Sequence, residues 1–345
     1  MNTAPPSLAD LGWSARFQAQ LGVGDAELAP LRITEVQRSR ATGQGTGGAR
    51  LLHFPPDISA GALAVGDWVL ADAEDRIARI LERRSLLSRK AAGVVIKPQL
   101  IAANVDTLFI VTSCNADFSV PRLERYVAAA LEAGAAPVIV ITKADQVADA
   151  GGYAAEARAI SDRIEGVVTL NARDPEALAA LAPWIAAGRT VAFLGSSGVG
   201  KSTLVGGLTG AEIATQDIRE DDAKGRHTTT ARSLYVLPRG GLLIDMPGMR
   251  EFALVDAAEG IGELFDDIEA LERQCKFRNC AHESEPGCAI RAAIASGDLQ
   301  EGRYARWQKL KREDTRNSES VALARKKDRA FGRMVKEAVD RKRRD

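Results

Sequence analysis

Gly195-Ser-Ser-Gly-Val-Gly-Lys201-Ser202-Thr203 follows a short apolar run, Thr190–Leu194, and precedes Leu204–Leu208. It has the G-x-x-x-x-G-K-[ST] pattern of a phosphate-binding loop between a buried strand and a helix. Backbone N–H groups of such a loop converge on phosphate oxygens, and the helix N-terminus adds its positive dipole end. We therefore expect a nucleotide to contact Gly195, Ser196, Ser197, Gly198, Val199, Gly200, Lys201, Ser202 and Thr203. Lys201 would reach the β- and γ-phosphates, and the Ser202 hydroxyl would bind Mg²⁺. A glycine-rich turn without a ligand is the alternative.

The composition is typical of a globular protein. With 345 residues, 46% of them hydrophobic and 27% charged, the chain has room for two or three domains. No apolar run approaches the roughly 20 residues that span a bilayer. The first residues, Met1–Ser7, lack the basic and apolar regions of a signal peptide. We expect a cytoplasmic monomer with no membrane partner.

The zero net charge conceals an uneven distribution. Residues 303–345 contain sixteen Lys/Arg against seven Asp/Glu, a net charge of +9, so the rest of the chain carries −9. A basic tail on an acidic body favours a polyanionic partner, above all nucleic acid. A solvated charged helix would show the same bias.

Residues 31–88 alternate between short apolar–polar segments and turns. The segments are Arg32–Gln37, Arg50–Phe54, Asp67–Leu70 and Arg76–Leu81, and the turns include the glycine-rich Thr42–Gly48. Four or five short strands in about sixty residues predict a small β-barrel of the OB or SH3 type. Residues 8–21 precede it with apolar positions at helical spacing.

From Gln99 onward, apolar strands alternate with helices. The expected strands are Val105–Thr112, Pro137–Ile141 and Val167–Leu170, and the expected helices are Pro121–Ala133, Gly151–Ile164 and Pro175–Ala187. This alternation predicts an α/β domain with a doubly wound, mostly parallel sheet.

A loop that can read guanine follows the second of these strands. In Thr142-Lys-Ala-Asp145, the Asp145 carboxylate can accept hydrogen bonds from the base, while the Lys143 stem packs over the ring. Asn171 and Ala172, after the next strand, are placed to supply backbone N–H groups to the same base. A K-x-D tripeptide alone is weak evidence, because Asp145 could be a helix cap. The occurrence of this tripeptide together with a phosphate-binding loop favours a nucleotide site. One departure from the usual motif is Thr142, which replaces the more usual asparagine.

Two further segments can close over the phosphates. Lys224–Thr230 lies in a polar loop, and we expect Thr228 or Thr229 to bind Mg²⁺. Gly241–Gly248 is an apolar strand that ends in D-x-P-G. Asp245 would hold Mg²⁺, and the backbone N–H of Gly248 would sense the γ-phosphate.

A cysteine and histidine cluster predicts a metal site near the C-terminus. Cys275, Cys280, His282 and Cys288 supply three thiolates and one imidazole within fourteen residues, enough for a closed tetrahedral zinc site. A closed four-ligand site is structural, so we expect one structural Zn²⁺. Buried unliganded cysteines are the alternative. Cys114 lies outside the cluster and is expected to be an ordinary core or strand-end residue.

The order of the motifs is unusual for a GTPase, because the base-reading loops precede the phosphate-binding loop. In this respect the chain resembles circularly permuted GTPases, and specifically the ribosome small-subunit-dependent GTPase (RsgA) family. The resemblance implies an N-terminal OB barrel, a permuted GTPase domain and a C-terminal helical zinc domain. The corresponding segments are 1–30 (helical extension), 31–92 (OB barrel), 93–255 (permuted GTPase), 256–315 (zinc domain) and 316–345 (basic helix or tail).

The resemblance also implies an activity: hydrolysis of GTP, with Mg²⁺, by a factor that binds rRNA during late assembly of the small ribosomal subunit. Met249 stands where many GTPases have a glutamine that orients the attacking water. His227 is the only histidine near the nucleotide motifs, and the family has a proposed catalytic histidine there. We therefore expect Lys201, Gly248 and His227 to act in catalysis, with turnover stimulated by the subunit. The alternatives are an ATPase or nucleotide kinase, and a nucleic-acid-binding regulator without significant turnover.

Overall fold

The structure is a computed structural model that describes residues 5–56, 58–90, 98–210, 232–245 and 257–319. The chain divides into two compact units, Met1–Leu87 with Leu100–Glu251, and Ser88–Gln99 with Phe252–Asp345. None of the helices in the described ranges is long and apolar enough to cross a membrane.

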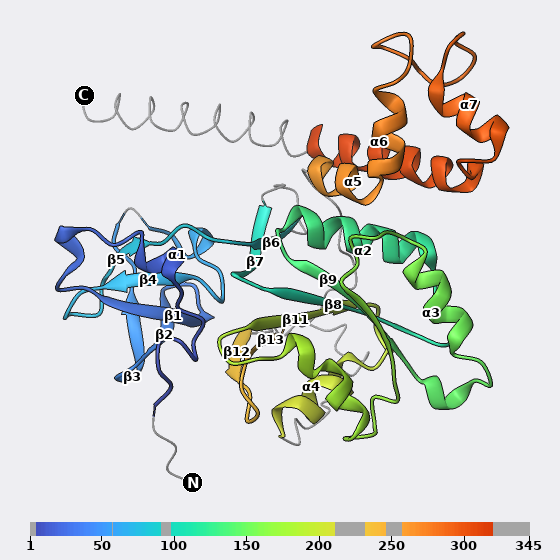
Figure 1. Cartoon of the computed structure of the whole chain (residues 1–345). Coiled ribbons are helices and arrows are strands. Elements are labelled where there is room, and N and C mark those ends of the chain that lie inside the picture. The colour runs from blue at the N-terminus through green and yellow to red at the C-terminus, as the bar shows by residue number, and fades with distance from the viewer. Residues whose placement is uncertain (1–4, 57, 91–97, 211–231, 246–256, 320–345) are drawn as a thin grey trace, which may run out of the picture. The chain divides into compact units, whose positions relative to one another are not determined.

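The first sheet is a five-stranded antiparallel barrel (Figure 1). Its strands are β1 (Ala29–Val36), β2 (Arg40–Gly45), β3 (Gly48–His53), β4 (Trp68–Ala71) and β5 (Ile77–Ile80), in the order β3-β2-β1-β4-β5. A parallel bridge between His53 and Arg76 joins the two outer strands and curls the sheet on itself. The sequence allowed a barrel of the OB or the SH3 type, and this strand arrangement is that of an OB barrel.

One glycine-rich segment of the barrel differs from the prediction. Thr42–Gly48 was expected to be a turn, but most of it belongs to β2. A Cβ on Gly43 would lie 3.0 Å from the Leu31 Cβ and 2.9 Å from the Leu52 Cδ1. Gly43 therefore serves close packing of large apolar side chains from the two neighbouring strands, and strands use glycine where another chain segment approaches closely.

The N-terminal segment is less helical than its spacing predicts. Only α1 (Ala15–Gln18) is helical within residues 8–21, and a single 3₁₀ turn, η1 (Val23–Asp25), follows it. A second 3₁₀ turn, η2 (Ala60–Ala62), lies between β3 and β4 of the barrel. The apolar residues of the N-terminal segment pack instead as an aromatic cluster. Trp13 meets Trp68 of β4 edge-on at 4.8 Å, and Phe17 lies 5.9 Å from the same ring. Contact with the barrel thus overrides helical spacing.

The second sheet has six strands in the order β10-β9-β8-β11-β13-β12. They are β8 (Thr107–Ser113), β9 (Ala136–Thr142), β10 (Gly166–Thr169), β11 (Thr190–Gly195), β12 (Ser233–Val236) and β13 (Leu242–Asp245). All neighbouring pairs are parallel except β12 with β13. The predicted doubly wound, mostly parallel sheet is confirmed. Separately, β6 (Leu86–Lys90) and β7 (Pro98–Ala103) form a two-stranded sheet.

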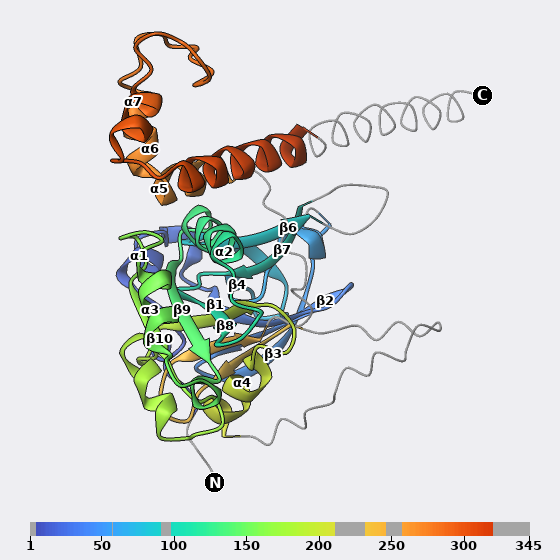
Figure 2. The same ribbon diagram turned by 90° about the vertical axis from the view of Figure 1, so that its right-hand side faces the viewer.

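Helices cover both faces of the larger sheet. The helices α2 (Val120–Glu132) and α3 (Gly151–Arg158) pack on one face, and α4 (Lys201–Thr209) lies on the other (Figure 1, Figure 2). Two short 3₁₀ segments, η3 (Ala144–Gln146) and η4 (Ala177–Trp184), lie in the connections. η4 replaces the α-helix expected over Pro175–Ala187, and it contains Pro183, which cannot donate a helical hydrogen bond.

Residues 257–319, the larger described part of the second unit, contain only helices and connecting segments. The helices are α5 (Ala258–Leu264), α6 (Asp266–Glu272), α7 (Ala289–Ser296) and a longer helix over residues 301–319. Their buried side chains include Phe265, Ile268, Ile290, Tyr304 and Trp307. Residues 273–288, which carry the four metal-ligand candidates, connect α6 to α7.

A buried ion pair holds the barrel's last turn. Arg83 donates to both carboxylate oxygens of Asp67 at 2.6 and 2.7 Å, and Asp67 also accepts from the backbone N–H of Ala64. The Asp67 side chain is fully buried, whereas Arg83 is partly exposed. The hydrogen bonds that Arg83 donates to Asp67 raise the pKa of Arg83, so the guanidinium stays charged at neutral pH.

We expect Asp67→Asn to lower the stability of the first unit by about 2 kcal/mol or more, because it leaves Arg83 without its charged partner. The measurement is the midpoint of urea unfolding followed by tryptophan fluorescence. Glu74→Gln is the matched control, since Glu74 pairs with Arg76 at an exposed site and should cost less than about 0.5 kcal/mol. Equal midpoints for the two variants would contradict the assignment.

Candidate functional site

The candidate nucleotide site lies at one edge of the six-stranded sheet. β8, β9, β10, β11 and β13 run parallel, so their carboxyl ends meet at the same edge. The phosphate-binding loop follows β11, the Thr142–Asp145 loop follows β9, and Asn171 comes just after β10. Asp245 is the last residue of β13, the strand beside β11. Ligands of open α/β sheets bind at this kind of edge.

The phosphate-binding loop turns sharply into α4. Gly200 has φ of 98°, a left-handed conformation that disfavours any side chain, and it directly precedes Lys201 at the start of α4. A Cβ at Gly200 would also lie 3.4 Å from the Thr142 hydroxyl. The Lys201 ammonium group donates to the carbonyl oxygen of Gly195 at 2.7 Å and to that of Ser196. Lys201 is thereby held over the loop that it belongs to.

Thr142 connects the base-reading loop to the phosphate-binding loop. Its side chain is fully buried, and its hydroxyl lies 2.6 Å from the carbonyl oxygen of Val199 and 3.1 Å from that of Thr112. A hydroxyl has one proton, so the shorter contact to Val199 is the stronger hydrogen bond. Although threonine replaces the usual asparagine, it still ties together the two loops.

The remaining base-reading residues lie around the ends of β9 and β10. Asp145 is exposed to solvent, and Lys143 before it has a left-handed backbone with φ of 59°. The backbone N–H of Ala144 donates to the Leu170 carbonyl, which links this loop to the segment of Asn171 and Ala172. The Asn171 side chain accepts from the Arg173 N–H, which shapes its own turn. The Asp145 carboxylate is thus accessible to a ligand.

The magnesium candidates divide between described and undescribed residues. Ser202 is exposed in the first turn of α4, and Asp245 is half-buried at the end of β13. His227, Thr228, Thr229 and Gly248 lie outside the described residues, as does Met249. Their roles in the site stay predictions.

Arg122, which no sequence motif marks, also reaches the phosphate-binding loop. It lies in the first turn of α2, and its Nη1 donates to the Ser196 hydroxyl at 3.0 Å. A second contact from Nη1 reaches the Asp117 carbonyl at 3.3 Å. An arginine at a helix start carries no sequence signal for this contact, because only the fold brings the start of α2 to the loop that follows β11.

Cys114 lies at the end of β8, close to the base-reading loop. Its backbone N–H donates to the Thr142 carbonyl at 3.0 Å, and its side chain is buried. Burial and the Asp145 carboxylate raise the pKa of the thiol, so Cys114 is a neutral thiol at physiological pH.

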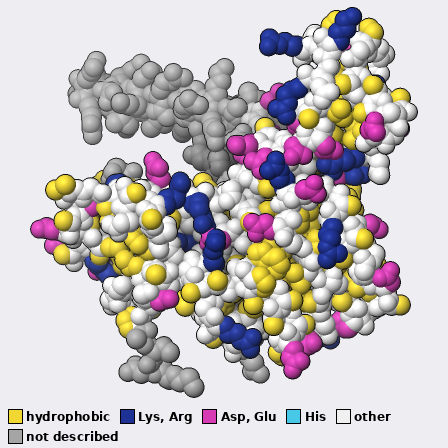
Figure 3. Space-filling view, in the orientation of Figure 1, with side chains coloured by type: hydrophobic (Ala, Val, Ile, Leu, Met, Phe, Trp, Pro, Cys, Tyr) yellow, Lys and Arg dark blue, Asp and Glu magenta, His cyan; other side chains and the backbone are white. Residues whose placement is uncertain are grey.

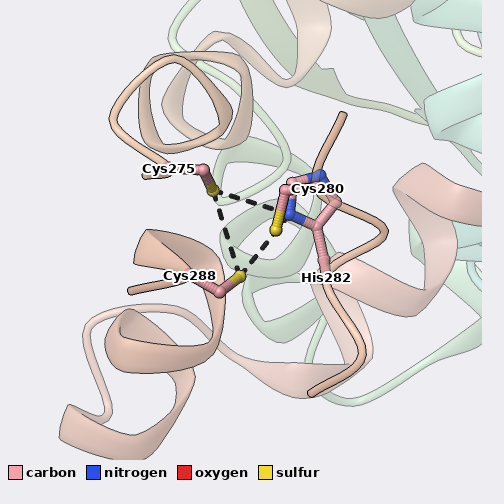
Figure 4. Close-up of side chains that lie close together, drawn as sticks. All are labelled: Cys275, Cys280, His282 and Cys288. Atoms are coloured by element: carbon pink, nitrogen blue, oxygen red, sulfur yellow. Dashed lines mark hydrogen bonds between the residues drawn. The ribbon is translucent and has the colours of Figure 1, made fainter. Parts of the chain in front are cut away.

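The structure brings the four metal-ligand candidates together (Figure 4). One donor atom from each of Cys275, Cys280, His282 and Cys288 lies within 4.8 Å of all the others. Desolvation and the neighbouring cysteine side chains raise the pKa of the Cys280 thiol to about 11. A bound cation would favour the thiolate, the form that ligates metals, so the cluster is chemically suited to one.

The distances within the cluster match a tetrahedral zinc centre. With Zn–S near 2.3 Å and Zn–N near 2.0–2.1 Å, tetrahedral geometry separates two sulfurs by about 3.8 Å and a sulfur from a nitrogen by about 3.6 Å. Cys275 Sγ lies 3.9 Å from Cys288 Sγ, and the His282 Nδ1 lies 3.6 and 3.5 Å from these two sulfurs. The donor set therefore fits a metal of this size and geometry.

Neighbouring side chains orient the ligands. The other ring nitrogen of His282 lies 3.4 Å from a Glu272 carboxylate oxygen, and Lys311 pairs with Glu272 at 3.2 Å. A carboxylate behind a ligating histidine fixes its ring and tautomer. Cys288 caps α7, where its sulfur accepts from the Arg291 N–H, and the Arg291 side chain donates to the His282 carbonyl. The sequence spacing identified the ligands but gave no sign of Glu272 or Lys311.

Comparison with known proteins identifies close relatives along most of the chain. The family model described as RsgA GTPase matches residues 80–255. A Mesorhizobium japonicum protein named small ribosomal subunit biogenesis GTPase RsgA is 52% identical over 323 residues, covering 92% of this chain and 93% of that relative. A Vibrio vulnificus protein, small ribosomal subunit biogenesis GTPase RsgA 2, is 47% identical and covers 97% of this chain and 96% of its own length.

Solved structures show the same fold at lower sequence identity. YjeQ from Thermotoga maritima superposes with a TM-score of 0.60 at 22% identity, covering 82% of this chain and 97% of that structure. YloQ, described as a circularly permuted GTPase, gives a TM-score of 0.59 at 23% identity, with 86% and 98% covered. The predicted circularly permuted GTPase fold is confirmed.

We expect Thr142→Val to weaken guanine-nucleotide binding by roughly tenfold, because it removes the hydrogen bond to Val199 and leaves that buried carbonyl unsatisfied. Titration with a fluorescent GDP analogue measures the effect. Thr142→Ser keeps the hydroxyl and should bind within about twofold of the unmodified chain. If the valine and serine variants bind equally, the link between the loops does not support the site.

Proposed function

The chain belongs to the RsgA GTPase family, and on that basis we propose that it hydrolyses GTP to GDP and phosphate as a late assembly factor of the small ribosomal subunit. The observation that carries the proposal is the Thr142–Val199 hydrogen bond, which couples a guanine-reading loop to a phosphate-binding loop. Relatives named small ribosomal subunit biogenesis GTPase supply the cellular role. A cytoplasmic location and rRNA binding are part of the same proposal.

In this proposal the nucleotide lies along the carboxyl edge of the sheet. Backbone N–H groups from Gly195 to Thr203 hold the phosphates, and Lys201 places its charge at the β- and γ-phosphates. Asp145 accepts from the guanine base, an interaction that adenine does not offer in the same arrangement. Asn171 and Ala172 supply backbone N–H groups to the base. Ser202, Asp245 and either Thr228 or Thr229 hold Mg²⁺, which neutralises phosphate charge when bound.

Hydrolysis requires a positioned water molecule, and the chain has no glutamine at the usual place. His227 can accept a hydrogen bond from water through a neutral ring nitrogen, whereas the Met249 thioether is only a weak acceptor. We assign the orientation of the attacking water to His227, and the sensing of the γ-phosphate to the Gly248 N–H. Since positioning by a partner accelerates GTPases strongly, subunit binding would complete the site.

The second unit supplies the proposed structural zinc centre and part of the RNA-binding surface. The cluster distances and the Glu272–His282 contact support Zn²⁺ at Cys275, Cys280, His282 and Cys288. On the exposed side of the same loop, Lys276 and Arg278 flank Phe277, whose side chain is exposed. Cationic and aromatic side chains of this kind bind RNA phosphates and unstacked bases.

We expect GTP turnover to be slow for the isolated chain and to rise at least about tenfold with purified small ribosomal subunits, because the subunit completes water positioning. Phosphate release under multiple turnover measures the rate, with ATP as the nucleotide control. In the same assay His227→Ala should lose the stimulation but bind GTP, whereas His53→Ala, an exposed histidine on β3, should retain it. A rate that subunits leave unchanged contradicts the proposed function.

We expect the purified full-length chain to contain about one zinc ion, and Cys280→Ser to lose most of it, because three remaining ligands cannot close a tetrahedral site. Elemental analysis after dialysis against a chelator measures the content. Cys114→Ser is the control, since Cys114 is a cysteine outside the cluster. Equal zinc loss in both variants, or no zinc in the unmodified chain, would refute the assignment.

A further inference from the structure

A polar cavity of about 310 Å³ lies within the first unit, and none of its lining residues belongs to the nucleotide motifs or the metal-ligand candidates. The N-terminal segment, the barrel and the larger sheet each form part of its wall. Its charged and aromatic lining residues are Trp13, Phe17, Arg32, Arg84, Asp106 and Arg189. The volume is that of a small-molecule site, at the lower end of the usual range.

Arg32 contributes a buried and incompletely satisfied cation to this cavity. Its side chain belongs to β1 and is only 1% exposed. Both of its hydrogen bonds to described residues leave from Nη2, toward the neutral Asn104 carbonyl and the Thr190 hydroxyl. Its Nε is buried with no hydrogen-bond partner in the described chain. Burial lowers the pKa of Arg32 to about 10, so the guanidinium stays charged at neutral pH.

The single carboxylate of the lining is already shared between two other arginines. Asp106 is nearly buried and pairs with Arg84 at 2.6 Å and with Arg189 at 2.9 Å. It also accepts from the Thr190 backbone N–H. Three guanidinium groups and one carboxylate leave the lining with a net charge of +2. Figure 3 shows Lys and Arg side chains on the surface where the barrel meets the larger sheet.

We propose that this cavity binds a small phosphate monoester, with the phosphate among Arg32, Arg84 and Arg189 and the organic part against Trp13 and Phe17. Guanidinium groups bind phosphate oxygens through paired N–H donors. A monoester carries about −1.5 to −2 charges at pH 7, which matches the +2 of the lining better than a single carboxylate does. Bound there, the ligand joins the N-terminal segment, the barrel and the larger sheet.

The test is calorimetric titration of the GDP-saturated full-length chain with phenyl phosphate and with inorganic phosphate. Both should bind, and phenyl phosphate should bind more tightly because its ring meets the aromatic wall. Arg189→Gln should weaken phenyl phosphate binding roughly tenfold or more. Arg189 suits the test because its side chain is 61% exposed, and Asp106 keeps Arg84 as a partner. Arg239→Gln, an exposed arginine outside the cavity, should bind normally.

Several outcomes would overturn the proposal. One is that neither probe binds, and another is that Arg189→Gln and Arg239→Gln bind phenyl phosphate equally, which places the anion elsewhere. Tighter binding of succinate than of phenyl phosphate would assign the cavity to carboxylates. A short RNA without terminal phosphates should not compete with phenyl phosphate. Competition that disappears in Arg189→Gln would assign a backbone phosphodiester in place of the monoester.

Discussion

The pairing of β8 with β11 is the constraint on which the rest of the first unit depends. These strands are parallel neighbours in register, with Phe109 opposite Phe193 and their rings stacked at 5.1 Å. The two strands come from segments more than seventy residues apart, before and after the base-reading loops. Their pairing fixes which end of every parallel strand faces the candidate nucleotide site. A permuted chain order can therefore produce the same edge, because the sheet specifies where loops emerge and not the order in which the chain visits them.

At that edge, the Thr142 hydroxyl links two loops, although the sequence suggested that threonine would do this less well than the usual asparagine. Thr142 lacks the amide of the usual asparagine, yet its burial under Gly200 places its hydroxyl against the Val199 carbonyl. The close approach is possible because Gly200 has no side chain. The base-reading loop and the phosphate-binding loop are thus hydrogen-bonded to each other. In the proposed function this bond would couple guanine contact at Asp145 to phosphate contact at Lys201.

The sequence predicted the features that depend on local pattern. The apolar strand predicted over Val105–Thr112 and found as β8, the phosphate-binding loop and the metal-ligand spacing all follow from short-range rules. It failed where a distant neighbour decides the local conformation. Gly43 and Gly45 read as turn residues, but the bulk of Leu31 on the adjacent strand requires glycine within β2. The contacts of Arg122 with Ser196 and of Glu272 with His282 are likewise long-range, so no spacing rule could have indicated them.

The candidate metal centre accounts for the order of a segment in the second unit that has little apolar burial. Between α6 and α7, residues 273–288 form no helix or strand, and most of their side chains are exposed. Such a segment buries too little apolar surface to offset the conformational entropy that ordering it costs. The buried residues within it are His282 and Cys288, both ligand candidates, with Tyr304 and Trp307 packed edge-on to the imidazole. In the proposed zinc centre, coordination by these residues would supply the ordering free energy that apolar burial supplies elsewhere. The loop can then present Lys276, Phe277 and Arg278 outward, since none of the three is needed for its core.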